Sequence, residues 1–338
     1  MAAKSPKAKK VKEVETVLPA DADLIDFHET GLIHTLNHWL NRKEVSHSLL
    51  MTGPRGIGKR TFAHHLAQWW MCENSVFNSG TTGGLRGCQE CASCKRALSQ
   101  SYLDLVEIAS EADSGTGESS QIKIEALRQV KDSLGMGAFS GRYRVVLIRE
   151  AERLTPQAAN SLLKMLEEPP PGWIFVLTAS DPSLVLPTLV SRCQILRMRP
   201  LPDEVLKKIL LEKDVAIEKV SPVVAQSHGS LGLALSLSLP EFWETRQGIL
   251  RFVENPQAEY SALTDWAAAD PTQFQFLLNQ LESICVDKIY ASKDDRLRQF
   301  WISSVIRISK ARQESLSPVN RKILIQDILL PWVSPSAG

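Results

Sequence analysis

The chain has 338 residues, of which 43% are hydrophobic and 23% are charged, and its formal net charge is +1. This composition is that of an ordinary soluble globular protein, long enough for two or three domains and a sizeable core. A net charge so near zero excludes strong non-specific binding of nucleic acid through the overall charge of the protein. No run approaches the roughly 18 apolar residues of a membrane span, so no membrane partner is expected.

The N-terminus is basic but not apolar. Five lysines occur before residue 13, with no hydrophobic stretch behind them, so the segment is not a secretory signal. We predict a disordered basic tail over residues 1–20, with a DNA-binding arm as the less favoured alternative. Without an export signal, a cytoplasmic location and reduced thiols are expected.

A glycine-rich loop follows a short apolar strand predicted at residues 48–51. It runs from Gly53 to Gly58 and Lys59, and a helix is predicted behind it at residues 60–72. Strand, loop and helix in this order are the context that a phosphate-binding loop requires. In a working ATPase the residue after the lysine is Ser or Thr, whose hydroxyl holds Mg²⁺, but here it is Arg60.

The second metal position is altered in the same way. The apolar strand predicted at residues 143–148 should end in an Asp for Mg²⁺, and it ends in Arg149, with Glu150 next to it. One arginine at about 5 Å repels Mg²⁺ by roughly 6–7 kcal/mol before screening. Thr61 is displaced by about 100° around the helix and is a poor substitute. We expect no Mg²⁺-dependent hydrolysis.

Lys59 survives, which leaves two interpretations of the loop. Weak nucleotide binding without Mg²⁺ would use Gly53, Gly58 and Lys59. The favoured alternative is a structural lysine that caps the loop or pairs with an acid, which makes ATP binding doubtful.

Four of the six cysteines are clustered, at Cys72, Cys88, Cys91 and Cys94. Two-residue spacings let neighbouring sulfurs converge on one ion, and four thiolates suit tetrahedral Zn²⁺. We predict structural zinc, with an iron–sulfur cluster or idle thiols as the alternatives. A catalytic zinc is not expected, because four cysteines leave no open position. Cys285 is predicted to be a small buried residue.

Up to residue 200, the predicted strands and helices alternate along the chain. Thr155 is a predicted N-cap with Pro156 at the first helical position, and a run of three prolines from Pro169 ends that helix. Alternation implies a parallel sheet with helices on both faces, and only helices are predicted after Pro200. The other predicted elements are strands at 103–108, 173–177 and 194–198 and a helix at 124–134.

Three stretches then resemble the clamp-loader subunits of the AAA+ class. These are the loop with its cysteine insertion, the run from Asn160 to Pro170 that reads NSLLKMLEEPP, and the Ser191-Arg192-Cys193 motif. The resemblance implies an AAA+ α/β domain at 21–200 with a zinc module at about 72–94. It also implies a small helical lid at 201–240 and an all-α collar for oligomerisation at 241–332.

The positions at which this chain departs from the family pattern indicate which members of the family it resembles. Arg60 and Arg149 replace metal ligands, and Gly232 stands where the family's phosphate-sensing arginine is expected. These losses resemble the delta prime members of bacterial DNA polymerase III, which implies a stator without ATPase or polymerase activity of its own. The spacing between Cys72 and Cys88, 15 residues, exceeds that of the family and weakens Cys72 as a ligand.

The resemblance also implies partners and a role for Arg192. In a ring of AAA+ subunits, a neighbour inserts an arginine towards the γ-phosphate, and Arg192 is the candidate finger. The implied partners are gamma/tau subunits, a delta subunit, the beta sliding clamp and primer–template DNA. Two alternatives remain: a gamma/tau-like motor that uses Thr61 and Glu150, and a zinc-bearing AAA+ scaffold outside replication.

Overall fold

The computed structural model describes residues 24, 27–28, 31–32, 47–74, 76–77, 85–98, 104–110, 121–132, 138, 142–315 and 319–333. The predicted tail at residues 1–20 lies outside these ranges. Among the described residues, no helix combines the length and the apolar character needed to cross a lipid bilayer.

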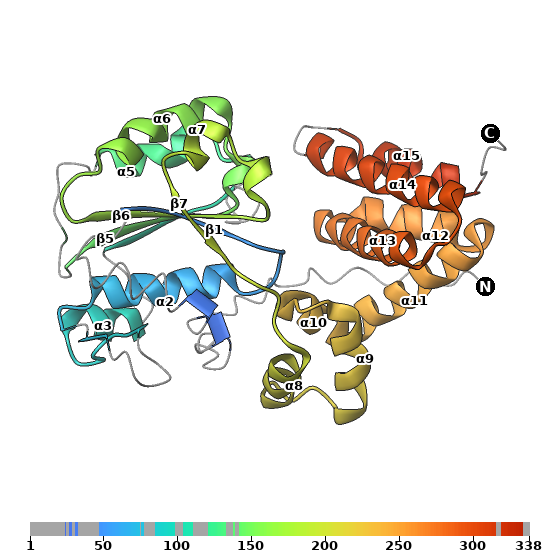
Figure 1. Ribbon diagram of the computed structural model, residues 1–338, viewed down its shortest axis with the longest axis horizontal. Coiled ribbons are helices and arrows are strands. Elements are labelled where there is room, and N and C mark those ends of the chain that lie inside the picture. Colours follow the sequence, from blue (N-terminus) through green and yellow to red (C-terminus); the bar gives the residue numbers. More distant parts are fainter. Residues whose placement is uncertain are drawn as a thin grey trace, which may run out of the picture.

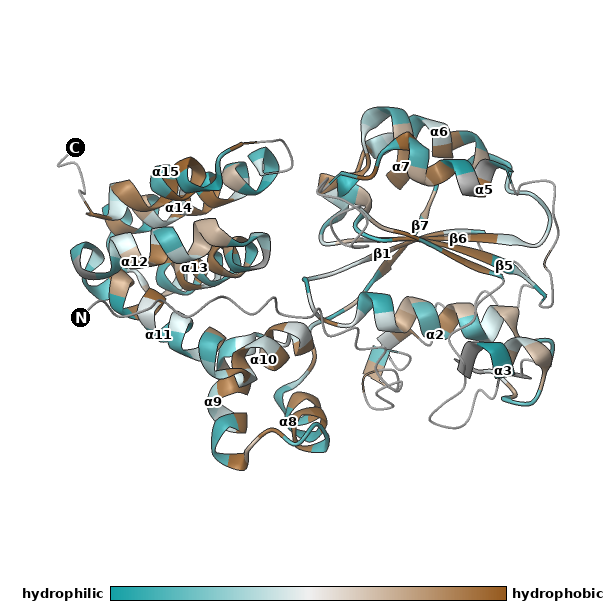
Figure 2. Ribbon diagram, turned by 180° about the vertical axis from the view of Figure 1, so that it is seen from behind, coloured by the Kyte–Doolittle hydropathy of each residue, from teal (hydrophilic) through white to brown (hydrophobic). Residues whose placement is uncertain are grey.

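Five parallel strands form one sheet in the order β4-β5-β6-β1-β7 (Figure 1). Three of them, β1, β5 and β6, are buried along most or all of their length, and Figure 2 shows the sheet as largely hydrophobic. Burial on both faces explains why these strands read as continuous apolar runs rather than as alternating ones. The bounds are β1 Ser48–Thr52, β4 Leu105–Ile108, β5 Arg144–Ile148, β6 Trp173–Ala179 and β7 Gln194–Arg197.

Helices cover both faces of this sheet, as the alternation predicted. On one face lie α2 (Lys59–Met71) and α3 (Ala92–Leu98), and on the other α5 (Arg128–Asp132), α6 (Pro156–Glu167) and α7 (Pro187–Val190) (Figure 1). Neighbouring residues of β1 face opposite layers: Leu49 and Met51 pack in the core under α2, whereas Leu50 packs in the core under α6. The layering follows from the two-residue period of a strand.

The predicted start of α6 is confirmed. The Thr155 hydroxyl accepts a hydrogen bond from the Ala158 N–H at 3.3 Å, and Pro156 is the first helical residue. The helix predicted at 124–134 instead opens as a 3₁₀ turn, η1 (Ile124–Leu127), before α5. Two further 3₁₀ turns are η2 (Ala151–Arg153) and η3 (Pro182–Leu184), and β2 (Val76–Phe77) pairs with β3 (Leu85–Arg86) as an antiparallel ribbon.

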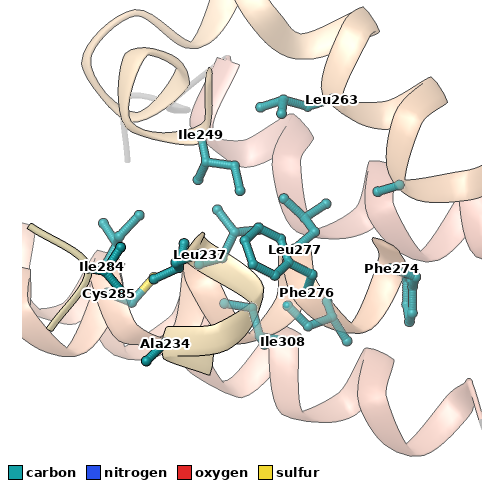
Figure 3. Close-up of a cluster of buried hydrophobic side chains, with 14 of the residues drawn as sticks. Ala234, Leu237, Ile249, Leu263, Phe274, Phe276, Leu277, Ile284, Cys285 and Ile308 are labelled. Carbon is teal, nitrogen blue, oxygen red and sulfur yellow. The ribbon is translucent and has the colours of Figure 1, made fainter. Parts of the chain in front are cut away.

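Every described element after residue 200 is a helix. The bounds are α8 Asp203–Glu212, α9 Ile217–Ser227, α10 Leu231–Ser238, α11 Pro240–Glu254, α12 Pro256–Ala269, α13 Pro271–Ala291, α14 Asp295–Glu314 and α15 Arg321–Val333. One continuous buried cluster runs through all of them, and Figure 3 shows part of it. It joins Leu237 of α10 with Ile249 of α11 and Leu277 of α13, and Cys285 is fully buried in it, as predicted. The lid and collar of the sequence prediction therefore share a core.

Candidate functional site

The glycine-rich loop between β1 and α2 is bonded to the chain itself through every carbonyl from residue 53 to residue 58. The Lys59 amine donates to the carbonyl oxygens of Gly53 and Pro54, at 2.6 and 2.8 Å. The carbonyls of residues 55 to 58 accept from the Ser230 hydroxyl, the Gly232 N–H, the His28 ring and the Phe62 N–H, at 2.8–2.9 Å. The lysine thus caps its own loop, in the arrangement that was favoured from sequence.

Burial acts on the charge of this lysine. It lowers the pKa of Lys59 to about 8, although Glu152 and Glu150 pull the value the other way. An amine that is held by two carbonyls and largely desolvated is a poor free cation for a phosphate.

The lid helix α10 touches the loop backbone directly. A Cβ built on Gly232 would lie 3.0 Å from the Gly56 Cα, and a Cβ on Gly56 would lie 2.4 Å from the Ser230 hydroxyl. Gly56 also has a φ of +74°, which glycine adopts without strain. Position 232, where the family pattern expects an arginine, is therefore packed so closely against the loop that a side chain there would press on the Gly56 backbone.

The two arginines at the metal-ligand positions converge on one carboxylate. Arg60 Nε lies 2.8 Å and Arg149 Nε 3.6 Å from Oε1 of Glu107, and His64 Nε2 lies 3.0 Å from its Oε2. Burial by itself would raise the pKa of Glu107, but the hydrogen bonds from His64 and Arg60 lower it to about 2. This carboxylate on β4 stays ionised and offsets one of the two arginine charges, so the cluster keeps a net positive charge that disfavours a dication.

The sequence favours pairing of Glu150 with a neighbouring base such as Arg149. A neighbouring base does pair with it, but that base is Arg153, at 2.6 Å, and Arg55 is a second partner at 3.7 Å. Arg149 is already directed towards Glu107 on the adjacent strand. Glu150 has a φ of +49°, which breaks the strand geometry after β5 and turns its side chain elsewhere.

Arg192 lies between α7 and β7 and is held on the surface by its own subunit. Its Nε donates to Oε1 of Glu167 at 2.5 Å, and its Nη2 forms an ion pair with the same oxygen. Its Nη1 donates to the Thr188 carbonyl at 3.0 Å and to the Ser191 hydroxyl at 3.3 Å. The side chain is 32% exposed. The Glu-Glu-Pro-Pro and Ser-Arg-Cys motifs thus meet through one ion pair.

The sequence predicted the residues of these motifs but missed three of their partners. Glu107 had a signal, because it is the one charge in the strand Leu105–Ile108. Ser230 and Glu167 had none, because their contacts lie 175 and 25 residues away along the chain.

All four clustered cysteines come together. Their sulfur atoms lie within 4.8 Å of one another, and Cys72, whose long spacing weakened it as a ligand, is one of the four. Backbone N–H groups of Cys88, Cys91 and Cys94 donate to the sulfurs of Cys72, Cys88 and Cys91, at 3.2–3.4 Å. Such bonds stabilise thiolates, and the Cys91 N–H helps to lower the pKa of Cys88 to about 6.

The cysteine cluster fits a metal ion. A Cβ on Gly87 would lie 2.7 Å from the Cys94 sulfur, so glycine is required for the chain to pass this closely. Four convergent sulfur ligands with donor N–H groups suit a soft or borderline ion and leave no position for a substrate. The other two cysteines, Cys193 and Cys285, lie outside this cluster, and burial raises the pKa of both thiols to about 12.

A protein-family model described as DNA polymerase III, delta subunit, matches residues 28–202, just over half of the chain. The chain belongs to this clamp-loader family. The delta prime subunit of Yersinia pestis is 28% identical over 340 residues, which cover 91% of this chain and 92% of the relative. The delta prime subunit of Bacillus subtilis is 31% identical, with 64% and 61% covered. The resemblance to delta prime members is thereby confirmed.

Gamma and tau subunits of DNA polymerase III are also similar to this chain. The gamma subunit of Buchnera aphidicola is 30% identical, and the match covers 61% of this chain and 55% of the relative. The chain thus spans about half the length of that relative, and 34% of the tau subunit of Bacillus subtilis. A solved gamma-subunit-related protein of Thermotoga maritima aligns with a TM-score of 0.42 at 17% identity, over 88% of this chain and 98% of that one.

Proposed function

We propose that this chain is a non-hydrolysing clamp-loader subunit that acts in DNA replication. It would offer Arg192 in trans to the ATP of a neighbouring gamma or tau subunit. The observation that carries the proposal is that Lys59 is bonded to carbonyls of its own loop, and that Arg60 and Arg149 are paired with Glu107.

The loop contacts support the absence of hydrolysis. Phosphoryl transfer needs a lysine on the phosphates, a metal held by a hydroxyl and a carboxylate, and an acid that positions water. Here Lys59 is engaged by carbonyls, Arg60 and Arg149 stand at the metal positions, and Glu150 is paired with Arg153. At each of these positions the side chain is therefore bonded within the protein.

Arg192 suits transition-state stabilisation in a neighbour. An arginine finger neutralises charge that develops on the transferred phosphoryl oxygens, and it contributes about 10³ to 10⁵ in rate. A planar, permanently charged guanidinium matches phosphate oxygens better than a lysine would. The partners in this proposal are gamma or tau subunits, a delta subunit and the beta sliding clamp on primer–template DNA, with the helices after residue 240 as the oligomerisation collar.

The four-cysteine cluster has a structural part in this proposal. Cys72, Cys88, Cys91 and Cys94 would hold one Zn²⁺ and tie the C-terminus of α2 to α3. Metal analysis of the purified chain is expected to give about one Zn per chain, and a metal-free chain with full stability would contradict the assignment.

The proposed function is tested with the chain alone and in a rebuilt complex. The isolated chain is expected to show no Mg²⁺-dependent ATP turnover, and clamp loading by gamma or tau with delta is expected to require it. Hydrolysis by the isolated chain that disappears in Lys59→Ala would show a motor instead. Clamp loading at full rate without the chain would contradict the role in replication.

A further inference from the structure

We propose that Glu167 is a positioning residue that latches the Arg192 guanidinium onto its own subunit until a phosphate displaces it. This inference rests on the proposed function and names how the finger is controlled. It is carried by the contacts between the end of α6 and the turn that links α7 to β7.

The latch engages all three nitrogen atoms of the guanidinium. A guanidinium has five N–H donors. Glu167 accepts from Nε and forms an ion pair with Nη2, and the Thr188 carbonyl and the Ser191 hydroxyl accept from Nη1. A phosphate binds a guanidinium best through two parallel N–H groups, and the carboxylate occupies the Nε–Nη2 edge that offers such a pair.

Charge leads to the same conclusion. While Glu167 is bound, the pair carries no net charge, and a neutral pair does little for the negative charge that develops on a transferred phosphoryl group. The γ-phosphate of a neighbour must therefore compete with the carboxylate for the same edge of Arg192. Binding of the γ-phosphate would therefore release Arg192 from Glu167.

The adjacent acid provides a matched control. Glu168 follows Glu167 at the C-terminus of α6 and is also exposed, but it is displaced by about 100° around the helix axis. It carries the same charge at nearly the same place without the contact to Arg192. A change in kcat/KM that comes only from the lost negative charge should appear in both Glu167→Gln and Glu168→Gln. A change that comes from the latch should appear only in Glu167→Gln.

The expected effect is modest because the pair is partly exposed, at 32% for Arg192 and 46% for Glu167. Exposed ion pairs shift equilibria by about 1.4- to 5-fold. In the rebuilt complex, Glu167→Gln is expected to raise kcat/KM for ATP within this range without lowering kcat, and Glu168→Gln is expected to leave both unchanged. The gain should shrink at high salt, where the latch is screened in the wild type.

A second readout does not depend on turnover. In the free chain labelled with ¹⁵N-arginine, the Nε–H signal of Arg192, identified by its loss in Arg192→Ala, should be protected from exchange. Glu167→Gln should remove that protection, and Glu168→Gln should keep it.

The outcomes separate the two proposals. If Arg192→Ala lowers turnover but Glu167→Gln leaves kcat/KM and Nε–H protection unchanged, the latch is overturned and the finger stands. A fall in kcat with Glu167→Gln also overturns the latch, because it would mean that the carboxylate orients the finger in the transition state. If Arg192→Ala leaves turnover unchanged, the proposed function itself fails.

Discussion

At the scale of single residues, an ion-pair cluster lies where the sequence pattern led us to expect metal ligands. Arg60 and Arg149 stand where ligands of Mg²⁺ are expected, and Glu107 holds both of them together with His64. The cluster closes only because β4 lies beside β5 in the sheet and α2 crosses above them. Substitution at the two metal positions is therefore compensated by a third residue.

Glu107→Gln is expected to destabilise the chain by about 1–3 kcal/mol at pH 7, because it leaves partly buried cations without their carboxylate. The pKa of Glu107 is about 2 in the fold, below its ordinary 4.5, so the fold stabilises the ionised form. That contribution is present above pH 4.5 and is lost as the pH falls from 4.5 to 2. Urea unfolding of the two proteins across this range measures it.

Glu314→Gln is a suitable control for that series. Glu314 lies on α14 at 44% exposure, and its ion pair with Lys310 is long, at 3.7 Å. It is expected to change stability by less than about 0.5 kcal/mol. A wild-type advantage over Glu107→Gln that stays constant from pH 7 to pH 2.5 would contradict the role assigned to the Glu107 charge.

At the scale of elements, α10 and the phosphate loop are joined by direct hydrogen bonds. The N-terminus of α10 donates to the loop through Ser230 and Gly232, and Arg55 in the loop donates to Gln275 of α13 at 3.4 Å. The loop is therefore bonded to the helices that follow residue 200.

Gly232→Ala tests the contact between α10 and the loop, and Gly248→Ala is the matched control. Both glycines lie in helices, where alanine normally stabilises by about 0.5–1 kcal/mol. The Cβ at 248 meets side-chain atoms no nearer than 3.7 Å, so the usual gain is expected there. The Cβ at 232 would press on the Gly56 backbone at 3.0 Å, and we expect a loss of about 1–2 kcal/mol. Equal gains at both positions in thermal unfolding would show that α10 does not hold the loop.

The cysteine module gives a second prediction at this scale. Cys91→Ser is expected to abolish stoichiometric zinc and lower the melting temperature, because a structural metal site stabilises the fold that forms it. Cys193→Ser is the control, since Cys193 lies outside the cluster. Metal analysis with calorimetry measures both, and zinc at full occupancy in Cys91→Ser would remove that residue from the ligand set.

At the scale of the whole molecule, the helices after residue 200 share one core. Phe252 of α11 is fully buried and its ring lies 5.7 Å from that of Trp332, and the same cluster includes Leu206 of α8 and Leu237 of α10. A shared core predicts cooperative opening of the lid and collar.

Phe252→Ala tests this coupling and is expected to cost about 3–5 kcal/mol, because it leaves a cavity in a closed core. Hydrogen exchange should then rise in α8–α10 together with α11–α15, while β1, β5 and β6 keep their protection. Loss of protection confined to α11–α15 would instead support two independent units with a boundary near residue 240.

The sequence predicted what depends on local patterns. Continuous apolar runs predicted the buried strands, Thr155 and Pro156 predicted the start of α6, and the cysteine spacing predicted the cluster. Partners across the fold could not be predicted, because Glu107 with Arg149 and Ser230 with Arg55 meet only through the order of strands and the docking of α10.

The most direct test of the account is the DNA- and clamp-stimulated ATPase of the complex rebuilt with gamma or tau and delta. It compares the wild-type chain with Arg192→Ala, after assembly has been checked by size. We expect an intact complex in which the neighbouring site is slowed by about 10³- to 10⁵-fold. Because other sites continue to turn over, the total rate should fall by the share that this site contributes. Unchanged turnover in an intact complex would contradict the account.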